Sequence, residues 1–265
     1  HKYTTNKVQP LHQFDSRNIL DTWLVARLKK AQQLITKYLD NYNIPKAVRE
    51  IRPLIEDIST WYIRRSRDRF VNGDKEALDT LFHAFYTLVL LLAPIAPFVA
   101  EAIYQNLFIG IDKMPESVHL CFWPEKSNIT ENEEQILKDM ELVRLIANLG
   151  NAIRKEKQIP VRQPLASITV FSEQNEITHD YQVIIREELN VKKVIWQQKK
   201  GDLKVEFDMT ISDELLAEGE ARKIIRSIQE ERKKSGVMLE DQVIITLPSW
   251  PISFEAEIKK KALVK

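Results

Sequence analysis

The sequence predicts a mostly α-helical fold, an antiparallel helical bundle followed by a smaller α+β domain. Two observations lead to this fold class. Apolar residues recur with the period of an α-helix through most of the first 157 residues. After the proline-containing segment 159–165, short alternating apolar runs and helical patterns follow in the order β-α-β-β-α-β. We therefore expect domains at residues 1–158 and 159–265, with a ferredoxin-like arrangement as one candidate for the second, which we expect to be cut short at its end.

The first two helices of the expected bundle are long and are separated by a short link. The first covers residues 20–43, and Asp15 or Ser16 is expected to cap it. The second covers residues 45–70 and contains Pro53, which lacks an N–H group and is expected to kink the helix.

Two more helices complete the bundle. The third covers residues 77–92, is apolar on almost all sides towards its end, and resumes over 99–107 after a proline bend. Residues 117–124 alternate like a short extended segment. The fourth helix covers residues 131–157, and its basic last turn suits the negative end of the helix dipole.

The second domain is expected to mix strands and helices. Strands are predicted at residues 166–171, 191–197, 203–211 and 242–247, and helices at residues 180–189, 214–234 and 254–265. Ser212 or Asp213 caps the long helix in this interpretation, and Gly236 ends it.

The composition of the 265 residues is that of a globular protein, with 44% apolar and 29% charged residues. The net charge is only +1, so binding to nucleic acid would require a local basic patch. A single cysteine, Cys121, excludes an internal disulfide and a cysteine zinc site within this sequence. No run approaches the ~20 apolar residues of a membrane span. We expect a soluble, cytoplasmic chain and, because the sequence does not start with Met, a piece of a longer protein.

The most distinctive stretch is residues 61–70, which places three aromatic residues and four arginines in ten positions. Guanidinium groups bind phosphate and aromatic rings stack on unpaired bases, so this mixture is typical of a surface for single-stranded nucleic acid. The alternative is a core face of aromatic residues opposite a solvated, salt-bridged arginine face. The residues are Trp61, Tyr62 and Phe70 with Arg64, Arg65, Arg67 and Arg69.

Two further groups belong to the same hypothesis. Trp23 and Arg27 lie four residues apart near the start of the first helix, and the fourth helix ends in a basic group. In an up-and-down bundle the start of the first helix meets the ends of the second and fourth helices. We therefore expect one basic surface, in which Trp23 and Trp61 are either core residues or platforms for bases. The basic group at the end of the fourth helix is Arg154, Lys155, Lys157 and Arg162.

The sequence contains no constellation of residues that is typical of a catalytic site. Its six glycines form no phosphate-binding loop, and its five histidines do not have the spacing of metal ligands. Adjacent glutamates on the predicted helices do not face each other and make poor acid–base pairs. His83, on an apolar helix, is expected to be a hydrogen-bonded core or boundary residue.

Several segments resemble one family closely. They are Leu20-Asp21-Thr22-Trp23, Trp61-Tyr62-Ile63-Arg64-Arg65, Ala93-Pro94-Ile95-Ala96-Pro97, Arg162-Gln163-Pro164-Leu165 and Glu218-Gly219-Glu220-Ala221-Arg222. Together they resemble isoleucyl-tRNA synthetases, which are class I aminoacyl-tRNA synthetases, over about residues 15–247. The last segment is similar to the C-terminal extension of the eukaryote-like branch of that family.

This resemblance implies an anticodon-binding bundle with an appended C-terminal domain. The expected partners are tRNA(Ile) and a catalytic domain of the same protein, with no role for DNA or a membrane. ATP and Mg²⁺ would act in that catalytic domain, because the family's ATP-binding motifs are absent here and Lys113-Met114-Pro115-Glu116-Ser117 matches one of them only in part. The fragment itself is therefore expected to hold no catalytic residue, cofactor or metal and to be inactive alone.

The resemblance also implies which residues bind tRNA. They are Trp23, Arg27, Trp61, Arg64, Arg65, Arg67, Arg69, Arg154, Lys155, Lys157 and Arg162. Some of these arginines, Arg64 above all, are alternatively struts to the catalytic domain. Two other functions stay open: the corresponding part of a valyl- or leucyl-tRNA synthetase, and a helical module that docks other proteins without contacting RNA.

Overall fold

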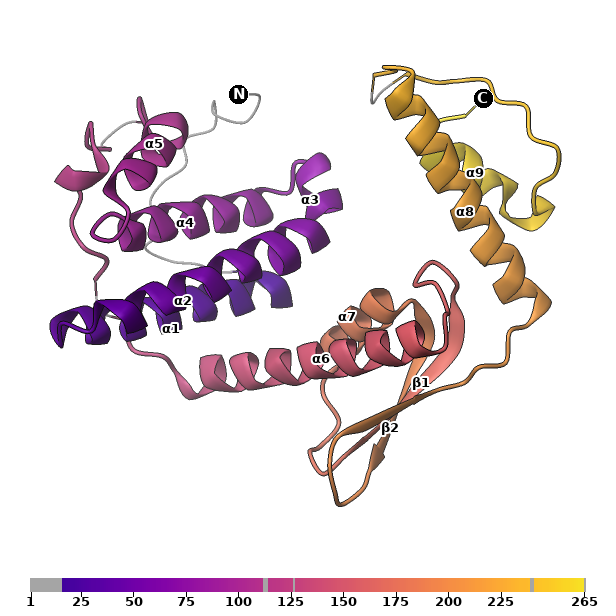
Figure 1. Cartoon of the computed structure of the whole chain (residues 1–265), viewed down its shortest axis with the longest axis horizontal. Coiled ribbons are helices and arrows are strands. Elements are labelled where there is room, and N and C mark those ends of the chain that lie inside the picture. Colours follow the sequence, from indigo (N-terminus) through magenta and orange to yellow (C-terminus); the bar gives the residue numbers. More distant parts are fainter. Residues whose placement is uncertain (1–15, 112–113, 126, 239–240, 265) are drawn as a thin grey trace. The chain divides into compact units, whose positions relative to one another are not determined.

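The computed structural model describes residues 16–111, 114–125, 127–238 and 241–264, and the chain forms two compact units (Figure 1). The units are His1–Met140 and Glu141–Lys265. The predicted fold class is confirmed, because the described residues are mostly helical and include one small sheet in the second unit. The boundary between the units lies within a helix, so the functional division expected at 158/159 stays a prediction.

The first unit consists of helices joined by short turns, except for a long connection between the last two of them. They are α1 (Ile19–Asp40), α2 (Ile44–Glu56), the π-helical segment η1 (Asp57–Ile63), α3 (Arg67–Val71), α4 (Lys75–Leu92), α5 (Pro97–Leu107) and the first part of α6 (Glu131–Glu156). The cap of α1 differs from the expectation. Asn18 caps this helix by accepting a hydrogen bond from the Leu20 amide at 2.9 Å. Ser16 instead lies 2.8 Å from the Asp21 carboxylate, and Asp15 lies outside the described residues.

The second expected helix is divided into three elements. Pro53 is accommodated inside α2, and the chain widens into π-helical turns from Asp57 onward. A π-helix is rare, and in α-helices such turns often mark functional positions. The short helix α3 follows, with Ser66 at its N-cap position.

The core of the first unit lies where α1, α2 and α4 pack together. Leu24, Leu28 and Ile35 of α1 are buried there with Leu54 of α2. As predicted, the end of α4 is its most buried part, since every residue from 87 to 92 is buried. The helices that carry the candidate residues are therefore fixed by apolar packing.

Residues 117–124 were expected to be extended, and this prediction is wrong in part. Val118–Leu120 form a single 3₁₀ turn, η2. The carboxylate of Glu101 on α5 explains this turn, because it accepts hydrogen bonds from the Ser117 hydroxyl at 2.9 Å and the Val118 amide at 3.0 Å. A local polar contact thus replaces the extended backbone.

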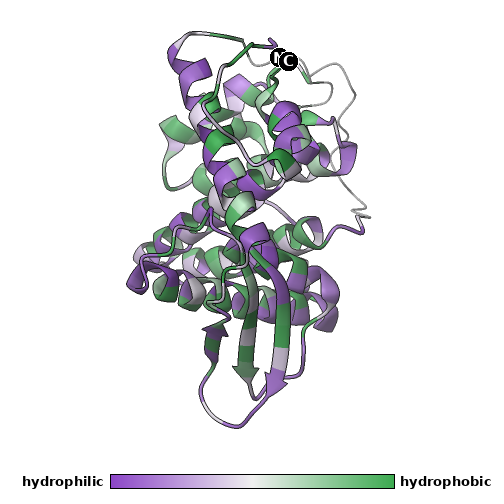
Figure 2. Cartoon of the chain, turned by 90° about the vertical axis from the view of Figure 1, so that its right-hand side faces the viewer, coloured by the Kyte–Doolittle hydropathy of each residue, from purple (hydrophilic) through white to green (hydrophobic). Residues whose placement is uncertain are grey.

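The second unit contains a three-stranded sheet in the order β2-β1-β3. Its elements are β1 (Leu165–Ser172), α7 (His179–Leu189), β2 (Val191–Gln198) and β3 (Lys204–Phe207). β1 pairs parallel with β2 and antiparallel with β3, and Figure 2 shows the strands side by side with apolar residues along them. β2 and β3 thus lie on opposite sides of β1.

The ferredoxin-like arrangement is not formed, because the strand expected at 242–247 is absent. Among the described residues, Val243 makes only an isolated bridge with Val264. The alternating pattern has another cause: Ile245 and Val264 pack against the apolar cluster between α8 (Asp213–Lys234) and α9 (Glu255–Ala262). The helices, and not the sheet, bury this apolar side.

The start and end of α8 agree with the prediction. Ser212 caps the helix by accepting a hydrogen bond from the Leu215 amide at 3.3 Å. Gly236 follows the helix with a φ of 68°, in the left-handed region that favours glycine.

Candidate nucleic-acid interface

The segment Trp61–Phe70, which we call the arginine segment, runs from η1 into α3. Its side chains differ in burial. Tyr62 and Ser66 are buried, whereas Arg64 and Arg67 are exposed. Trp61, Arg65 and Arg69 are half-buried. Part of the segment thus belongs to the core and part presents guanidinium groups at the surface, an arrangement that is compatible with both interpretations.

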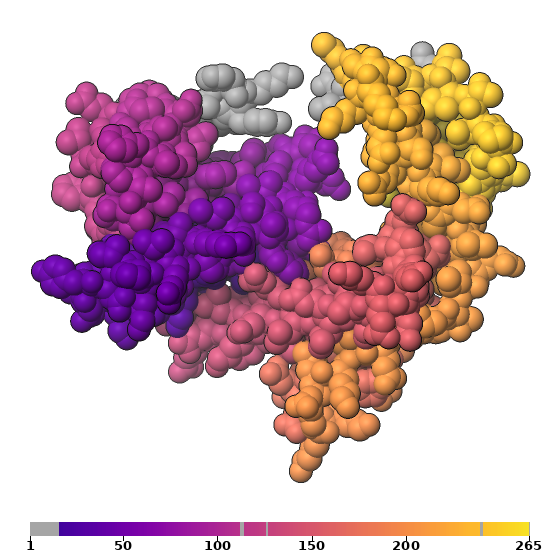
Figure 3. Space-filling view, in the orientation of Figure 1, coloured from indigo at the N-terminus to yellow at the C-terminus, as the bar shows by residue number. Residues whose placement is uncertain are grey.

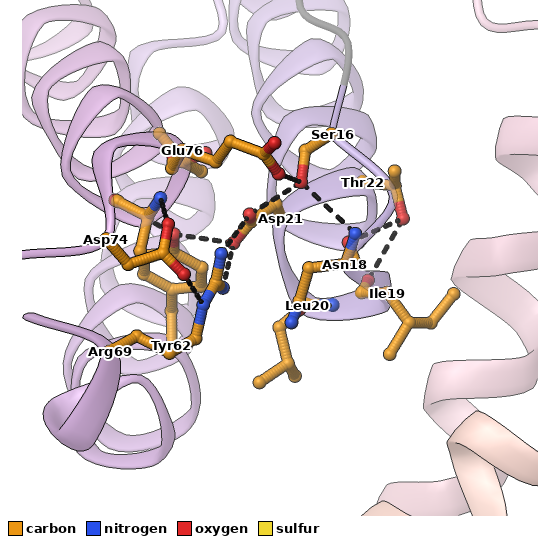
Figure 4. A network of polar contacts seen from close by, with 12 residues as sticks. Ser16, Asn18, Ile19, Leu20, Asp21, Thr22, Tyr62, Arg69, Asp74 and Glu76 are labelled. Carbon is orange, nitrogen blue, oxygen red and sulfur yellow. Dashed lines mark hydrogen bonds and ion pairs between the residues drawn. The ribbon is translucent and has the colours of Figure 1, made fainter. Parts of the chain in front are cut away.

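A polar network around Asp21 anchors the arginine segment to α1 (Figure 4). The fully buried Asp21 carboxylate accepts hydrogen bonds from the Arg69 guanidinium at 2.6 and 2.7 Å and from the Tyr62 hydroxyl at 2.7 Å. Arg69 Nε also contacts Asp74 at 2.7 Å, which lowers the pKa of the Asp74 carboxyl. Burial and the neighbouring Asp21 raise the pKa of Tyr62, so its hydroxyl stays protonated.

These contacts give Arg69 a structural role, and its contact with tRNA stays a prediction. Its guanidinium is committed to two carboxylates of the same unit. Such paired, bidentate geometry holds a side chain in one position. Arg69 therefore joins α1, α3 and the start of α4.

Trp23 and Arg27 are also structural in this unit. Trp23 is only 2% exposed and belongs to the core, so it has no free face on which a base could stack. Arg27 Nε lies 2.7 Å from Asp57 Oδ2, and Asp57 is buried. This ion pair joins α1 to the first residue of η1, so Arg27 positions the π-helical turns.

Arg154, in the second unit, is buried, with only 1% of the residue exposed. Its guanidinium donates hydrogen bonds to the carbonyl oxygens of Pro160, Gln163, Leu189 and Asn190, at 2.7–3.2 Å. Burial lowers the pKa of Arg154 to about 10. Arg154 thus fastens the end of α6 to the following loop and to the corner between α7 and β2, and its predicted contact with tRNA is not available in this structure.

The remaining predicted residues stay candidates. Lys155, Lys157 and Arg162 of the second unit are exposed, as are Arg64 and Arg67 of the first. The single surface predicted from the sequence would contain residues of both units, and it stays a prediction.

The comparison with known families identifies the kind of domain that carries these residues. Residues 21–170 match the family model described as "Anticodon-binding domain of tRNA ligase". The chain belongs to this family. The match includes the arginine segment, the whole of α6 and most of β1, and therefore covers every residue predicted to bind tRNA.

The relatives of this anticodon-binding domain include many isoleucine–tRNA ligases. The chain is 39% identical to that of Clostridium novyi over 188 residues, which is 68% of the chain and 18% of the relative. It is 32% identical to that of Clostridium tetani over 269 residues, which is 95% of the chain and 25% of the relative. The chain thus spans about a fifth of the length of the curated relatives. These relatives confirm the resemblance to isoleucyl-tRNA synthetases, whereas its assignment to a eukaryote-like branch stays a prediction.

The anticodon-binding domain has a second basic area that was not among the sites predicted from the sequence. Lys46, Arg49 and Arg52 are exposed along α2, at a spacing of three residues that places them on one side of the helix. Arg52 pairs with Glu56 at 3.0 Å. The spacing was visible in the sequence, but the nearby tyrosines, Tyr38 and Tyr42, precede these cations and are not interleaved with them as the aromatic residues of the arginine segment are with its arginines.

Two other properties of the described residues bear on the site. No group of three or more His, Cys, Asp or Glu side chains within them is arranged to hold a metal ion. Of the helices described, none is both long and apolar enough to cross a membrane.

Proposed function

We propose that this anticodon-binding domain binds the anticodon stem-loop of tRNA(Ile) as part of an isoleucine–tRNA ligase. The observation that carries the proposal is the family match over residues 21–170, together with the exposed arginines that lie within it. The isoleucine–tRNA ligases among the relatives support the choice of amino acid. Isoleucylation would take place in a cytoplasmic enzyme whose catalytic domain uses ATP and Mg²⁺.

In this proposal the buried contacts position the exposed ones. The Asp21–Arg69 and Arg27–Asp57 pairs hold η1 and α3 in place. Arg64 and Arg67, which are both exposed, would then contact backbone phosphates, which fix the register of the RNA. The half-buried Trp61 is the candidate for stacking on an unpaired base.

The direct test is a titration of labelled tRNA(Ile) with the full chain and its variants. Arg64→Ala and Arg67→Ala should each weaken binding and reduce the slope of log K against log salt by about 0.7–0.9, because each loses one phosphate contact. Lys138→Ala is the matched control, since Lys138 is an exposed cation of α6 outside the proposed surface. Unchanged affinity and slope in both arginine variants would remove these residues from the interface.

A second candidate function, docking of another protein domain, is favoured by α5. Phe98 is 89% exposed, and Val99 and Leu107 are exposed beside it. These residues line a shallow apolar depression of about 510 Å³. The helix carries no lysine or arginine, so this face suits an apolar protein surface such as the catalytic domain of the ligase better than RNA.

A further inference from the structure

The turn between α1 and α2 holds a tyrosine in an unusual backbone conformation. Tyr42 has a φ of 54°, in the left-handed region. Its amide donates to the Leu39 carbonyl at 2.9 Å, and the Asn43 amide donates to the Tyr38 carbonyl at 2.8 Å. These two hydrogen bonds define a Schellman motif, in which the position of Tyr42 is usually occupied by glycine.

The side chain of Tyr42 contributes little packing to the fold. It is 91% exposed, so its ring buries almost no apolar area. Among the described non-glycine residues with positive φ, Tyr42 is the only aromatic one. A strained backbone that carries an exposed ring is the kind of outlier from which a functional hypothesis is drawn.

The surroundings of Tyr42 are predominantly basic. Lys37, Lys46 and Arg49 are exposed, and none of them forms an ion pair with a described residue. Lys46 lies 5.8 Å from the centre of the Tyr38 ring, which brings a cation next to the turn. The acidic side chains nearest in sequence, Asp40 and Glu50, leave an excess of positive charge. Figures 1 and 3 show that this turn lies at one end of the first unit.

We propose that Tyr42 is a stacking platform for an unpaired base of bound tRNA, with Lys46 and Arg49 contacting the adjacent phosphates. The proposal rests on the proposed function and adds a contact that the arginine segment does not provide. Aromatic rings flanked by cations bind single-stranded RNA in this way. The cations around Tyr42 distinguish this site from the apolar face of α5, which carries no cation and suits a protein partner.

The Tyr42 site and the arginine segment contact different parts of the RNA. Helical rise places the start of α2 about 25 Å from Trp61. Effects of substitutions at the two sites on the binding free energy should therefore add, because distant positions without shared partners are usually independent. The double variant Tyr42→Ala/Arg64→Ala tests this directly.

The experiment compares three substitutions of Tyr42 in the full chain, with binding of tRNA(Ile) and the melting temperature as readouts. Tyr42→Phe keeps the ring and should bind within about twofold of the unsubstituted chain. Tyr42→Ala should weaken binding roughly 5- to 150-fold at an unchanged melting temperature, since one stacked base is lost. Tyr42→Gly should weaken binding equally and raise the melting temperature by roughly 2–4 °C, because glycine relieves the strained backbone.

The control is Phe98→Ala, which removes an equally exposed aromatic ring and should leave tRNA binding unchanged. Unchanged affinity of Tyr42→Ala and Tyr42→Gly, in a chain that itself binds tRNA, overturns this inference alone and points to a protein partner for the turn. A chain that does not bind tRNA at all overturns the proposed function and this inference with it.

Discussion

At the scale of single residues, the same side-chain type serves two purposes. Arg69 and Arg154 are buried or committed to partners, and they fasten elements together. Arg64 and Arg67, in the same segment as Arg69, are exposed. Since a guanidinium has five donors in a fixed fork, arginine suits both the carbonyl-lined interior and the proposed phosphate-binding surface.

The buried carboxylate of Asp21 is expected to dominate the stability of the first unit. Asp21→Asn removes the charge that Arg69 and Tyr62 face, and it should lower the free energy of unfolding by about 3 kcal/mol. Tyr62→Phe removes the hydroxyl that contacts Asp21 and the Ala77 carbonyl but leaves the Asp21–Arg69 pair, and it should cost about 1.5 kcal/mol. Urea unfolding of both variants measures this difference, and equal losses would contradict the role given to the Asp21–Arg69 pair.

His83 is expected to make stability depend on pH. Burial, aided by the nearby Lys29, lowers the pKa of His83 in the folded protein, so the unfolded chain binds the proton more readily. The stability contribution is present above the unfolded pKa of about 6.5 and is lost as the pH falls below it. Unfolding curves from pH 8 to 5.5 should show a loss that the variant His83→Gln lacks. Parallel curves for the two proteins would refute this linkage.

Sequence patterns identified the arginine segment but did not show which of its side chains are buried or paired and which are exposed. The spacing of Arg64, Arg67 and Arg69 along the helix does not show which of them is paired. That depends on whether a carboxylate from a distant part of the sequence lies beside the side chain. Asp21 lies 48 positions before Arg69, and no periodicity connects them. Trp23 and Arg154 were placed on the candidate surface for the same reason, although tertiary packing buries both.

At the scale of elements, the helices were largely predictable and their irregular parts were not. The apolar period of α1, α4 and α6 placed these helices within a few residues of their observed bounds. The π-helical turns of η1 have no comparable signature, because the apolar pattern continues through them. The alternating residues 242–247 have the pattern of a strand, yet this pattern is equally satisfied by packing on α8 and α9.

The junction between α8 and the loop before β1 depends on a close approach at Gly219. A Cβ atom there would lie 2.3 Å from Gln163 Oε1, and Gln163 Nε2 donates to the Leu215 carbonyl at 2.9 Å. Gly219→Ala should therefore displace Gln163 and lower the free energy of unfolding by about 1 kcal/mol.

The matched test of this junction is the same substitution in a Gln163→Ala background. Without the amide to displace, Gly219→Ala should be neutral or stabilising, because alanine favours a helix over glycine by up to about 1 kcal/mol. A thermodynamic cycle from urea unfolding gives the coupling between the two positions. Additive effects would show that the close contact does not govern this junction.

At the scale of the whole molecule, the small net charge of +1 means that any RNA binding depends on local patches. Affinity for tRNA should fall steeply between 50 and 200 mM salt as counterions are released. Phe98→Ala should not alter this salt dependence, because α5 carries no cation. Binding that is insensitive to salt would favour the docking function over RNA recognition.

The most direct test of the central claim is the dissociation constant of the full chain for tRNA(Ile) compared with the same tRNA carrying a substituted anticodon. Both are measured at one salt concentration. Because base contacts specify and phosphate contacts only position, the native anticodon should bind at least about 10-fold more tightly, roughly the effect of one base contact. Equal affinity for the two RNAs would contradict anticodon recognition by this chain.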